Sequence, residues 1–208
     1  VSVFTAANAA AARTAIGAGA VGGSVFTAAN AAAVYTALGL GDYANDAAAA
    51  LGDYIGGDHV TFAKRMTKTA RQLGMSNTTF KNANGLTAEG HLSTARDMNT
   101  LGRHLFYDFP QYYHIFSRRT ADAGIAQVAN TNTRFLDSYE GADGIKTGYT
   151  APAGFNLTSS AHRGSKHIIA TVFGGTSTAN RNAKMAELMD LGFGKAKNNV
   201  AEQPPEAA

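Results

Sequence analysis

The sequence predicts an α+β domain, in which helices come first along the chain, a compact antiparallel sheet follows, and a last helix packs on it. Two observations predict this class. Residues 59–74 and 93–107 carry apolar side chains at helical spacing, whereas residues 154–161 and 166–174 are apolar or alternating runs of strand length. Residues 162–165 join the two runs, so we expect an antiparallel hairpin.

Composition narrows the class of protein. The chain has 208 residues, which corresponds to one or two domains and is enough to bury a core. Cysteine is absent, so a disulfide framework, a thiolate zinc site and a cysteine nucleophile are excluded. The net charge of +3 is too small to indicate a nucleic-acid partner, and we expect none.

The sequence carries no signal for the membrane. It contains no run of 18 apolar residues, so we expect no membrane span. It begins at Val1 without a recognisable secretory signal, and we expect that it was processed or belongs to a longer protein.

The first 41 residues consist of two copies of one repeat. Residues 2–19 and 24–41 align at a period of 22, with 14 of 18 positions identical. In each copy a threonine, Thr5 or Thr27, can cap a short alanine-rich helix that a glycine then ends. A helix this short is marginal alone in water, so residues 1–41 are either a linker or a docking segment, and we favour docking.

The repeat resembles the alanine-rich repeats of bacteriophage tail fibres and other virion proteins. This resemblance covers residues 1–41 only, and it implies contacts with other virion proteins through that segment. Docking helices on fibrous virion parts often occur in threefold sets, so the resemblance also implies a homo-oligomer.

From residue 42 the composition becomes that of a globular domain, which we expect to extend to residue 194. Residues 44–56 predict a helix with Asn45 or Asp46 near its start. The next helix, over residues 59–74, has an apolar stripe that comprises Val60, Ala63, Met66, Thr67, Ala70 and Leu73.

The rest of the domain alternates turns, helices and strands. Residues 76–90 are rich in turn residues, and Ser93 or Thr94 is expected to cap the helix over residues 93–107. The remaining predicted elements are an aromatic segment from Pro110 through Phe116, a strand and its neighbour at 125–130 and 132–136, a helix at 177–191 and a mobile polar tail at 195–208.

The tripeptide Lys146-Thr147-Gly148 stands just before the hairpin and carries the candidate chemistry. At a sheet edge, a lysine ammonium and a threonine hydroxyl can bind a substrate carboxylate. Gly148 leaves space where a substrate backbone would lie against the strand. The three residue types are common, so it is their position before the hairpin that makes them informative.

Several stretches carry a resemblance over residues 43 to about 192: ANDAAAALGDYIGG, FAKRMTKTARQLGMSNTTFKNANGL, STARDMNTLGRHL, FPQYY, GADGIKTGYTAPAGFNLTSSA and the MAEL helix. They resemble the C-terminal two thirds of the transpeptidase-like domain of D-alanyl-D-alanine carboxypeptidases, the low-molecular-mass penicillin-binding proteins. The resemblance implies a partial penicillin-binding-protein or serine β-lactamase-like fold, with an antiparallel sheet and helices. It also implies serine acyl transfer on peptidoglycan stem peptides, without a metal.

The machinery of that family has three parts: S-x-x-K, S-x-N and K-T-G. The third is intact at residues 146–148, and at the second the sequence reads Tyr43-Ala44-Asn45, so that only the asparagine matches. No serine in the chain has a lysine three residues later, so S-x-x-K is missing.

Covalent catalysis needs a nucleophile beside a base, so we expect no catalytic residue here and no activity by the family mechanism. The resemblance then implies that four residues are remnants of a substrate-binding site, namely Lys146, Thr147, Gly148 and Asn45. The tripeptide is either a strand kept only for folding or a site with residual ligand binding.

Other clusters give weaker signals. The six histidines show no metal-ligand spacing, so we expect no metal and no cofactor. Ser165 and Lys166 are adjacent in a turn, too close for a catalytic pair. Arg118 and Arg119, together with the basic residues at 64, 65, 68 and 71, predict a solvated face rather than a patch for an anionic polymer. The aromatic residues from 106 to 116 predict core rather than a sugar platform.

Three hypotheses for function follow. The first is a virion-associated structural or envelope-binding protein that displays a degenerate, inactive carboxypeptidase-like domain. The second is an active serine-type D-alanyl-D-alanine carboxypeptidase, located in the periplasm or cell envelope, whose nucleophile lies outside this chain. The third is a cell-wall-binding pseudoenzyme that is not part of a virion. The repeats favour the first, with peptidoglycan or another envelope polymer as a further partner.

Overall fold

The computed structural model describes residues 43–122 and 127–206. The predicted repeat helices of residues 1–41 lie outside these ranges, as do the first two residues of the strand predicted at 125–130. The described elements in chain order are α3 (Tyr43–Gly56), α4 (His59–Gln72), α5 (Ala95–Asp108), α6 (Pro110–Tyr113), the 3-10 helix η2 (His114–Ser117), β1 (Thr120–Asp122), β2 (Gln127–Ala129), α7 (Thr133–Ser138), β3 (Ala142–Thr150), β4 (Gly154–Arg163), β5 (Lys166–Gly175) and α8 (Thr178–Lys195).

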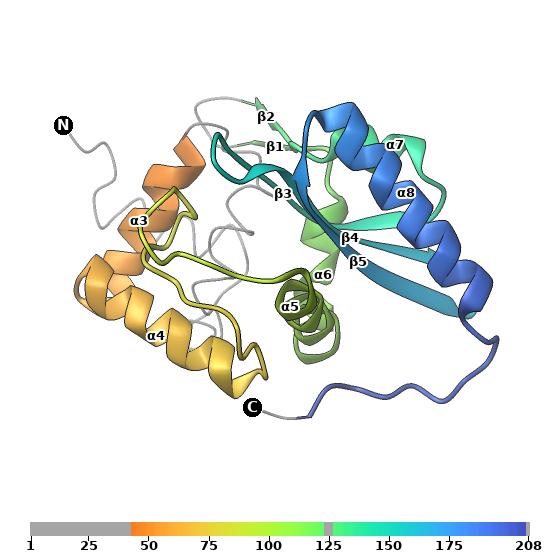
Figure 1. Ribbon diagram of the computed structural model, residues 1–208, viewed down its shortest axis with the longest axis horizontal. Helices are drawn as coiled ribbons and strands as arrows, with labels where there is room; N and C mark the ends of the chain where they lie inside the picture. Colours follow the sequence, from red (N-terminus) through yellow and green to blue (C-terminus); the bar gives the residue numbers. More distant parts are fainter. Residues whose placement is uncertain (1–42, 123–126, 207–208) are drawn as a thin grey trace.

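The centre of the fold is a three-stranded antiparallel sheet in the order β3-β4-β5. Its β4–β5 hairpin confirms the predicted one, with Arg163 opposite Lys166 at the turn. Helix α8 packs against β4 and β5 on one face of the sheet, and α5 packs on the other face, as Figure 1 shows. The predicted α+β class, with helices first, an antiparallel sheet and a last helix packed on it, is therefore confirmed.

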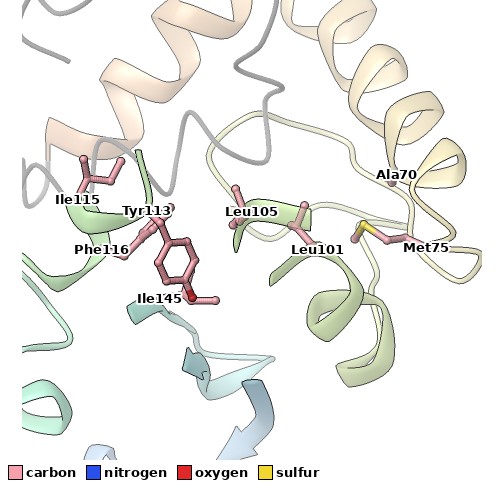
Figure 2. Close-up of a cluster of buried hydrophobic side chains, with 8 residues drawn as sticks. All are labelled: Ala70, Met75, Leu101, Leu105, Tyr113, Ile115, Phe116 and Ile145. Atoms are coloured by element: carbon pink, nitrogen blue, oxygen red, sulfur yellow. The ribbon is translucent and has the colours of Figure 1, made fainter. Parts of the chain in front are cut away.

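Two buried clusters lie on opposite faces of the sheet because side chains alternate along each strand. On β5, Ile169 packs against the first cluster, whereas Ile168 and Ala170 belong to the second. Figure 2 shows the first cluster, where α5, the α6–η2 segment and β3 converge: Ala70, Met75, Leu101, Leu105, Tyr113, Ile115, Phe116 and Ile145. The second cluster lies under α8 and comprises Phe135, Tyr139, Leu157, Ala161, Ala170, Met185, Met189 and Phe193.

Side-chain caps fix where three helices begin, and at the start of α8 the Ser177 hydroxyl accepts a hydrogen bond from the Asn180 amide at 3.0 Å. Asp58 accepts a hydrogen bond from the Thr61 amide at 2.8 Å at the start of α4. Thr94 accepts from the Asp97 amide at 3.1 Å before α5, which selects Thr94 over Ser93 as the cap. Each cap satisfies an amide of the first helical turn that has no partner within the helix.

The apolar stripe predicted for α4 is partly wrong. Val60 is 49% exposed, whereas Phe62, which the prediction left out, is fully buried. The reason is a close approach of α3, where two glycines leave room for the Phe62 ring and backbone. A Cβ at Gly52 would lie 2.5 Å from Phe62 Cδ1, and a Cβ at Gly56 would lie 2.6 Å from Phe62 Cβ.

The strand predicted at residues 132–136 is also wrong, because those residues fall in the turn and first part of α7. Two hydrogen bonds start this helix: the amide and the hydroxyl of Thr133 both donate to the Asn130 carbonyl, at 3.2 and 2.6 Å. The turn chemistry of the asparagines thus outweighs the β-branched and aromatic residues that favoured a strand. The short hairpin of β1 and β2 precedes this turn.

The tail after α8 makes contacts with the domain. The Asn199 amide donates to the Ser165 hydroxyl at 3.2 Å, and the Arg103 guanidinium donates to the Gln203 carbonyl at 2.6 Å. In Figure 1 the tail runs from the end of α8 towards the side of α5. The mobility predicted for this segment remains a prediction.

Replacement of Gly52 by Ala tests the α3–α4 packing. We expect Gly52→Ala to lower the free energy of unfolding by about 1–2 kcal/mol, because overpacking against buried Phe62 exceeds the gain in helix propensity. The matched control is Gly194→Ala in α8, where a Cβ would meet no described atom within 4 Å. That variant should gain up to ~1 kcal/mol in urea unfolding. Stabilisation by Gly52→Ala would contradict the packing described.

Candidate functional site

The candidate site lies on β3, which forms one edge of the described three-stranded sheet. Lys146, Thr147 and Gly148 occupy the middle of this strand, opposite Thr158, Leu157 and Asn156 of β4. On its other side β3 has no strand partner among the described residues. The edge therefore presents main-chain groups that an extended peptide can pair with.

Lys146 is partly buried and has few partners. Its ammonium donates to the Thr147 carbonyl and, at 3.3 Å, to the Thr147 hydroxyl. Burial lowers the pKa of Lys146 from its ordinary value to about 8, and the positive charge of Arg181 lowers the pKa further in the same direction. Burial and the charge of Arg181 both disfavour the charged form of Lys146. An anion bound beside Lys146 would stabilise that charged form and raise its pKa.

Arg181 is the second cation of the site, and the sequence analysis did not single it out. Its side chain is only 4% exposed, and burial lowers its pKa. Nε and Nη2 of the guanidinium donate to Asn182 Oδ1 at 3.1 and 2.8 Å. No ion pair among the described residues includes Lys146 or Arg181.

Helix α8 places Arg181 at the site. Arg181 stands on the same face as Met185, Met189 and Phe193, so it enters the protein on an otherwise apolar stripe. Gly175, at the end of β5, lets the first turn of α8 pack close to the strand, because a Cβ at this position would lie 2.9 Å from Arg181 Cβ. An arginine at the spacing of a buried apolar stripe was the one available sequence signal for this residue.

Thr147 is buried and shares its hydroxyl with a second threonine that the sequence analysis also missed. The oxygens of Thr147 and Thr131 are 2.6 Å apart, a short hydrogen bond in which either can donate. Thr131 lies in the turn between β2 and α7, and it is exposed. The two threonines are 16 residues apart in the chain, so their contact leaves no periodic pattern in the sequence from which it could be predicted.

Gly148 has a conformation and surroundings that do not require glycine. Its φ lies outside the left-handed region, and a Cβ there would meet only Asn156 Cβ, at 4.0 Å, among the described atoms. The fold therefore tolerates a side chain at this position. Apart from Asn156 Cβ, no atom of the described residues lies within 4 Å of that Cβ position, and the role of Gly148 in admitting a substrate backbone remains a prediction.

The structure does not link Asn45 to the other predicted site residues. Asn45 is partly buried in the first turn of α3. Within the described part of the chain, the side-chain hydrogen bonds of Lys146 and Thr147 involve one another and Thr131. The assembled group is therefore Lys146, Thr147 and Gly148 together with Thr131 and Arg181.

A cluster of polar side chains on β3, β4, β5 and α6 contains the residue types of a catalytic triad, but its hydrogen bonds do not connect them in the order serine, histidine, aspartate. Ser160 donates to Asp143, and Tyr113 donates to Ser160 at 2.7 Å. Nε2 of His167 lies 3.1 Å from the same carboxylate, so Asp143 separates the serine from the histidine. Ser160 is also fully buried. The histidine cannot take the serine proton, and this cluster ties β3, β4 and β5 to α6 instead.

Other sites are not found in the described ranges. No group of three or more histidine, cysteine or acidic residues within 43–122 and 127–206 could hold a metal ion. Among these same residues, no helix is long and apolar enough to cross a membrane. The aromatic segment contributes Tyr113 and Phe116 to the core, in agreement with the expectation of core packing.

A family model of D-alanyl-D-alanine carboxypeptidases matches residues 11–177. Among curated proteins, the chain is 42% identical over 154 residues to the D-alanyl-D-alanine carboxypeptidase DacF of Bacillus subtilis, covering 72% of this chain and 39% of that protein. It is 39% identical over 149 residues to DacC of Escherichia coli, with 72% and 37% covered. The chain thus spans about two fifths of the length of these relatives.

Solved structures of penicillin-binding proteins resemble the fold. Penicillin-binding protein D2 from Listeria monocytogenes, bound to cefotaxime, superposes with a TM-score of 0.69 at 36% identity, covering 77% of this chain and 65% of that one. Penicillin-binding protein 6B from Escherichia coli gives 0.69 at 33% identity, with 81% and 55% covered. These matches give no support to the expected virion association, whose basis, residues 1–41, lies outside the described residues.

Substitution of Lys146 tests the electrostatic description of the site. We expect Lys146→Met to raise the free energy of unfolding at pH 7 by about 1 kcal/mol, because it removes a charge that burial disfavours. The pKa is lower in the folded than in the unfolded protein, so the native chain should regain stability as pH rises from about 8 towards 10.5, and the difference should shrink.

Urea unfolding at pH 7 and pH 9.5 measures both quantities. The control is Lys184→Met, an exposed lysine of α8 paired with Glu187 at 2.7 Å, which should change stability little at either pH. A Lys146→Met variant less stable than the native chain at pH 7 would contradict the description.

Proposed function

Because this chain belongs to the family of D-alanyl-D-alanine carboxypeptidases, we propose that it binds the D-alanyl-D-alanine end of peptidoglycan stem peptides in the cell envelope. The observation that carries the proposal is that two cations have no carboxylate partner among the described residues: Lys146, on the edge strand β3, and Arg181, whose charge acts on Lys146. A peptide carboxylate supplies the missing negative charge.

The geometry suits an extended peptide that ends at this point. The peptide lies along the free edge of β3 and pairs with its main-chain groups, as an added strand does. The open space at Gly148 lets the two backbones approach. The terminal carboxylate then accepts hydrogen bonds from the Thr147 hydroxyl and from the two cations, and bonds between ionised partners are the stronger ones.

Bond cleavage requires a nucleophile that this chain does not hold. No serine in the 208 residues has a lysine three positions later. Ser159 and Ser160, the serines of β4, are fully buried, and their hydroxyls donate to the Gly144 carbonyl and to Asp143. We therefore infer that the serine and its activating lysine come from polypeptide outside these 208 residues, and that this chain supplies the carboxylate-binding half of a carboxypeptidase site.

A second candidate function is binding without cleavage, in a cell-wall-binding pseudoenzyme. The missing S-x-x-K motif favours it, because loss of both the nucleophile and its base removes acyl transfer but leaves the carboxylate-binding residues in place. The two candidates share the same peptide ligand and differ in whether a complementary polypeptide exists.

Binding of N-acetyl-D-Ala-D-Ala tests the shared part. Isothermal titration at pH 7 should detect binding to the native chain. Lys146→Met and Arg181→Met should each weaken binding by about tenfold or more, because each removes a charged hydrogen-bond donor from the carboxylate. Lys184→Met, on the exposed face of α8, is the matched control and should bind as the native chain does. Equal affinity in all four proteins would refute the assignment of the site.

Labelling with a fluorescent penicillin tests whether the chain has a nucleophile of its own. On a denaturing gel we expect no covalent band from the chain alone, because no exposed serine of the described part has a lysine beside it in the required spacing. A penicillin-binding relative labelled in parallel shows that the reagent is active. A covalent band on this chain would contradict the proposed division of the site.

A further inference from the structure

We propose that Thr131 is a positioning residue, which holds the Thr147 hydroxyl so that its proton points to the carboxylate of a bound peptide. The proposal rests on the proposed function above and assigns a role to a residue outside the Lys-Thr-Gly tripeptide. Its basis is the 2.6 Å separation of the two threonine hydroxyl oxygens.

A count of donors and acceptors at Thr147 gives the mechanism. A hydroxyl has one proton to donate and two lone pairs that accept. The Lys146 ammonium can only donate, and at 3.3 Å from the Thr147 hydroxyl oxygen it takes one lone pair. If Thr131 donates to the other lone pair, the single proton of Thr147 has to point elsewhere, and a carboxylate in front of the strand is its acceptor.

Thr131 can perform this role because the turn that carries it is anchored on both sides. Asn130, which is buried, donates through its side-chain amide to the Arg118 carbonyl at 2.8 Å. Its side-chain oxygen accepts from the Asn132 amide, also at 2.8 Å, and its carbonyl accepts from the Thr133 hydroxyl. The Thr131 side chain is exposed, but its backbone is fixed by these bonds to the η2–β1 segment and α7.

The same turn is tied to β3 just before the tripeptide. The buried Asn132 donates to the Gly144 carbonyl at 3.4 Å, and Ser159 donates to the same carbonyl. Asn132 Oδ1 has no hydrogen-bond partner and is the one such buried side-chain atom among the described residues. An unpaired buried acceptor costs stability, and departures of this kind concentrate at functional sites. A buried hydrogen bond thus joins the turn that carries Thr131 to the strand that carries Thr147.

Two other roles for Thr131 make different predictions. If Thr131 contacted the peptide itself, its contribution to binding would not depend on Thr147. If Thr131 only stabilised the turn, its removal would lower stability and leave the orientation of the Thr147 side chain unchanged. A positioning role requires coupling between the two threonines, and a double-mutant cycle measures coupling.

The experiment compares Thr131→Val, which keeps the shape but lacks the hydroxyl, with Thr131→Ser, which keeps the hydroxyl. We expect Thr131→Val to weaken N-acetyl-D-Ala-D-Ala binding by about three- to tenfold, the loss of one hydrogen bond, and Thr131→Ser to restore it to within about twofold. In a Thr147→Val background, Thr131→Val should cause no further loss. Additive losses in the double variant would overturn the proposal in favour of direct contact.

A measurement without ligand separates this proposal from the proposed function. Three-bond scalar couplings between the hydroxyl proton and Hβ of Thr147 report the direction of its O–H bond in the ligand-free protein. We expect one O–H orientation in the native chain and in Thr131→Ser, and averaging over orientations in Thr131→Val. If the native chain binds no dipeptide, the proposed function fails, and these couplings then test the role of Thr131 by themselves. A single, unchanged O–H orientation of Thr147 in Thr131→Val overturns the positioning role whatever the binding result.

Discussion

Two positively charged side chains that are withdrawn from solvent and have no acidic partner among the described residues, Lys146 and Arg181, are the constraint on which the candidate site depends. Lys146 on β3 and Arg181 on α8 are both removed from solvent far enough to have lowered pKa values, and the charge of Arg181 contributes to the lowering at Lys146. Such an arrangement destabilises a folded protein unless a ligand supplies the counter-charge. The structure thus keeps an unfavourable interaction at the proposed carboxylate-binding site, as binding sites commonly do.

The rest of the fold serves to hold that pair. The second cluster of buried residues fastens α8 to the sheet, so that Arg181 is carried to the end of β5 by the packing of Met185 and Met189. On the opposite face, Ile145 fixes β3 against α5 and the α6–η2 segment. The side chains of Asn132 and Ser159 both donate hydrogen bonds to the Gly144 carbonyl of β3. The elements that carry Lys146 and Arg181 are therefore both held by the core and by buried hydrogen bonds in the ligand-free protein.

Sequence reasoning recovered the elements whose signals are local. The β4–β5 hairpin and α8 lie where apolar runs and the helix predicted at 177–191 placed them, and Lys146-Thr147-Gly148 was singled out as a candidate site by its place before the hairpin. Arg181 and Thr131 were missed because their roles arise from contacts between segments distant in the chain. The strand expected at residues 132–136 failed because an asparagine-rich turn starts a helix there. The link expected between Asn45 and the tripeptide is not seen in the described contacts.

Titration of the Lys146 side chain tests the central claim most directly. The 13Cε chemical shift of Lys146, followed by NMR against pH, gives its pKa in the free protein and in the presence of saturating N-acetyl-D-Ala-D-Ala. The account predicts a pKa of about 8 without ligand and a clear increase when the dipeptide is bound, because the carboxylate stabilises the charged ammonium. A pKa near 10.5 in the free protein, or one that the dipeptide leaves unchanged, would contradict it.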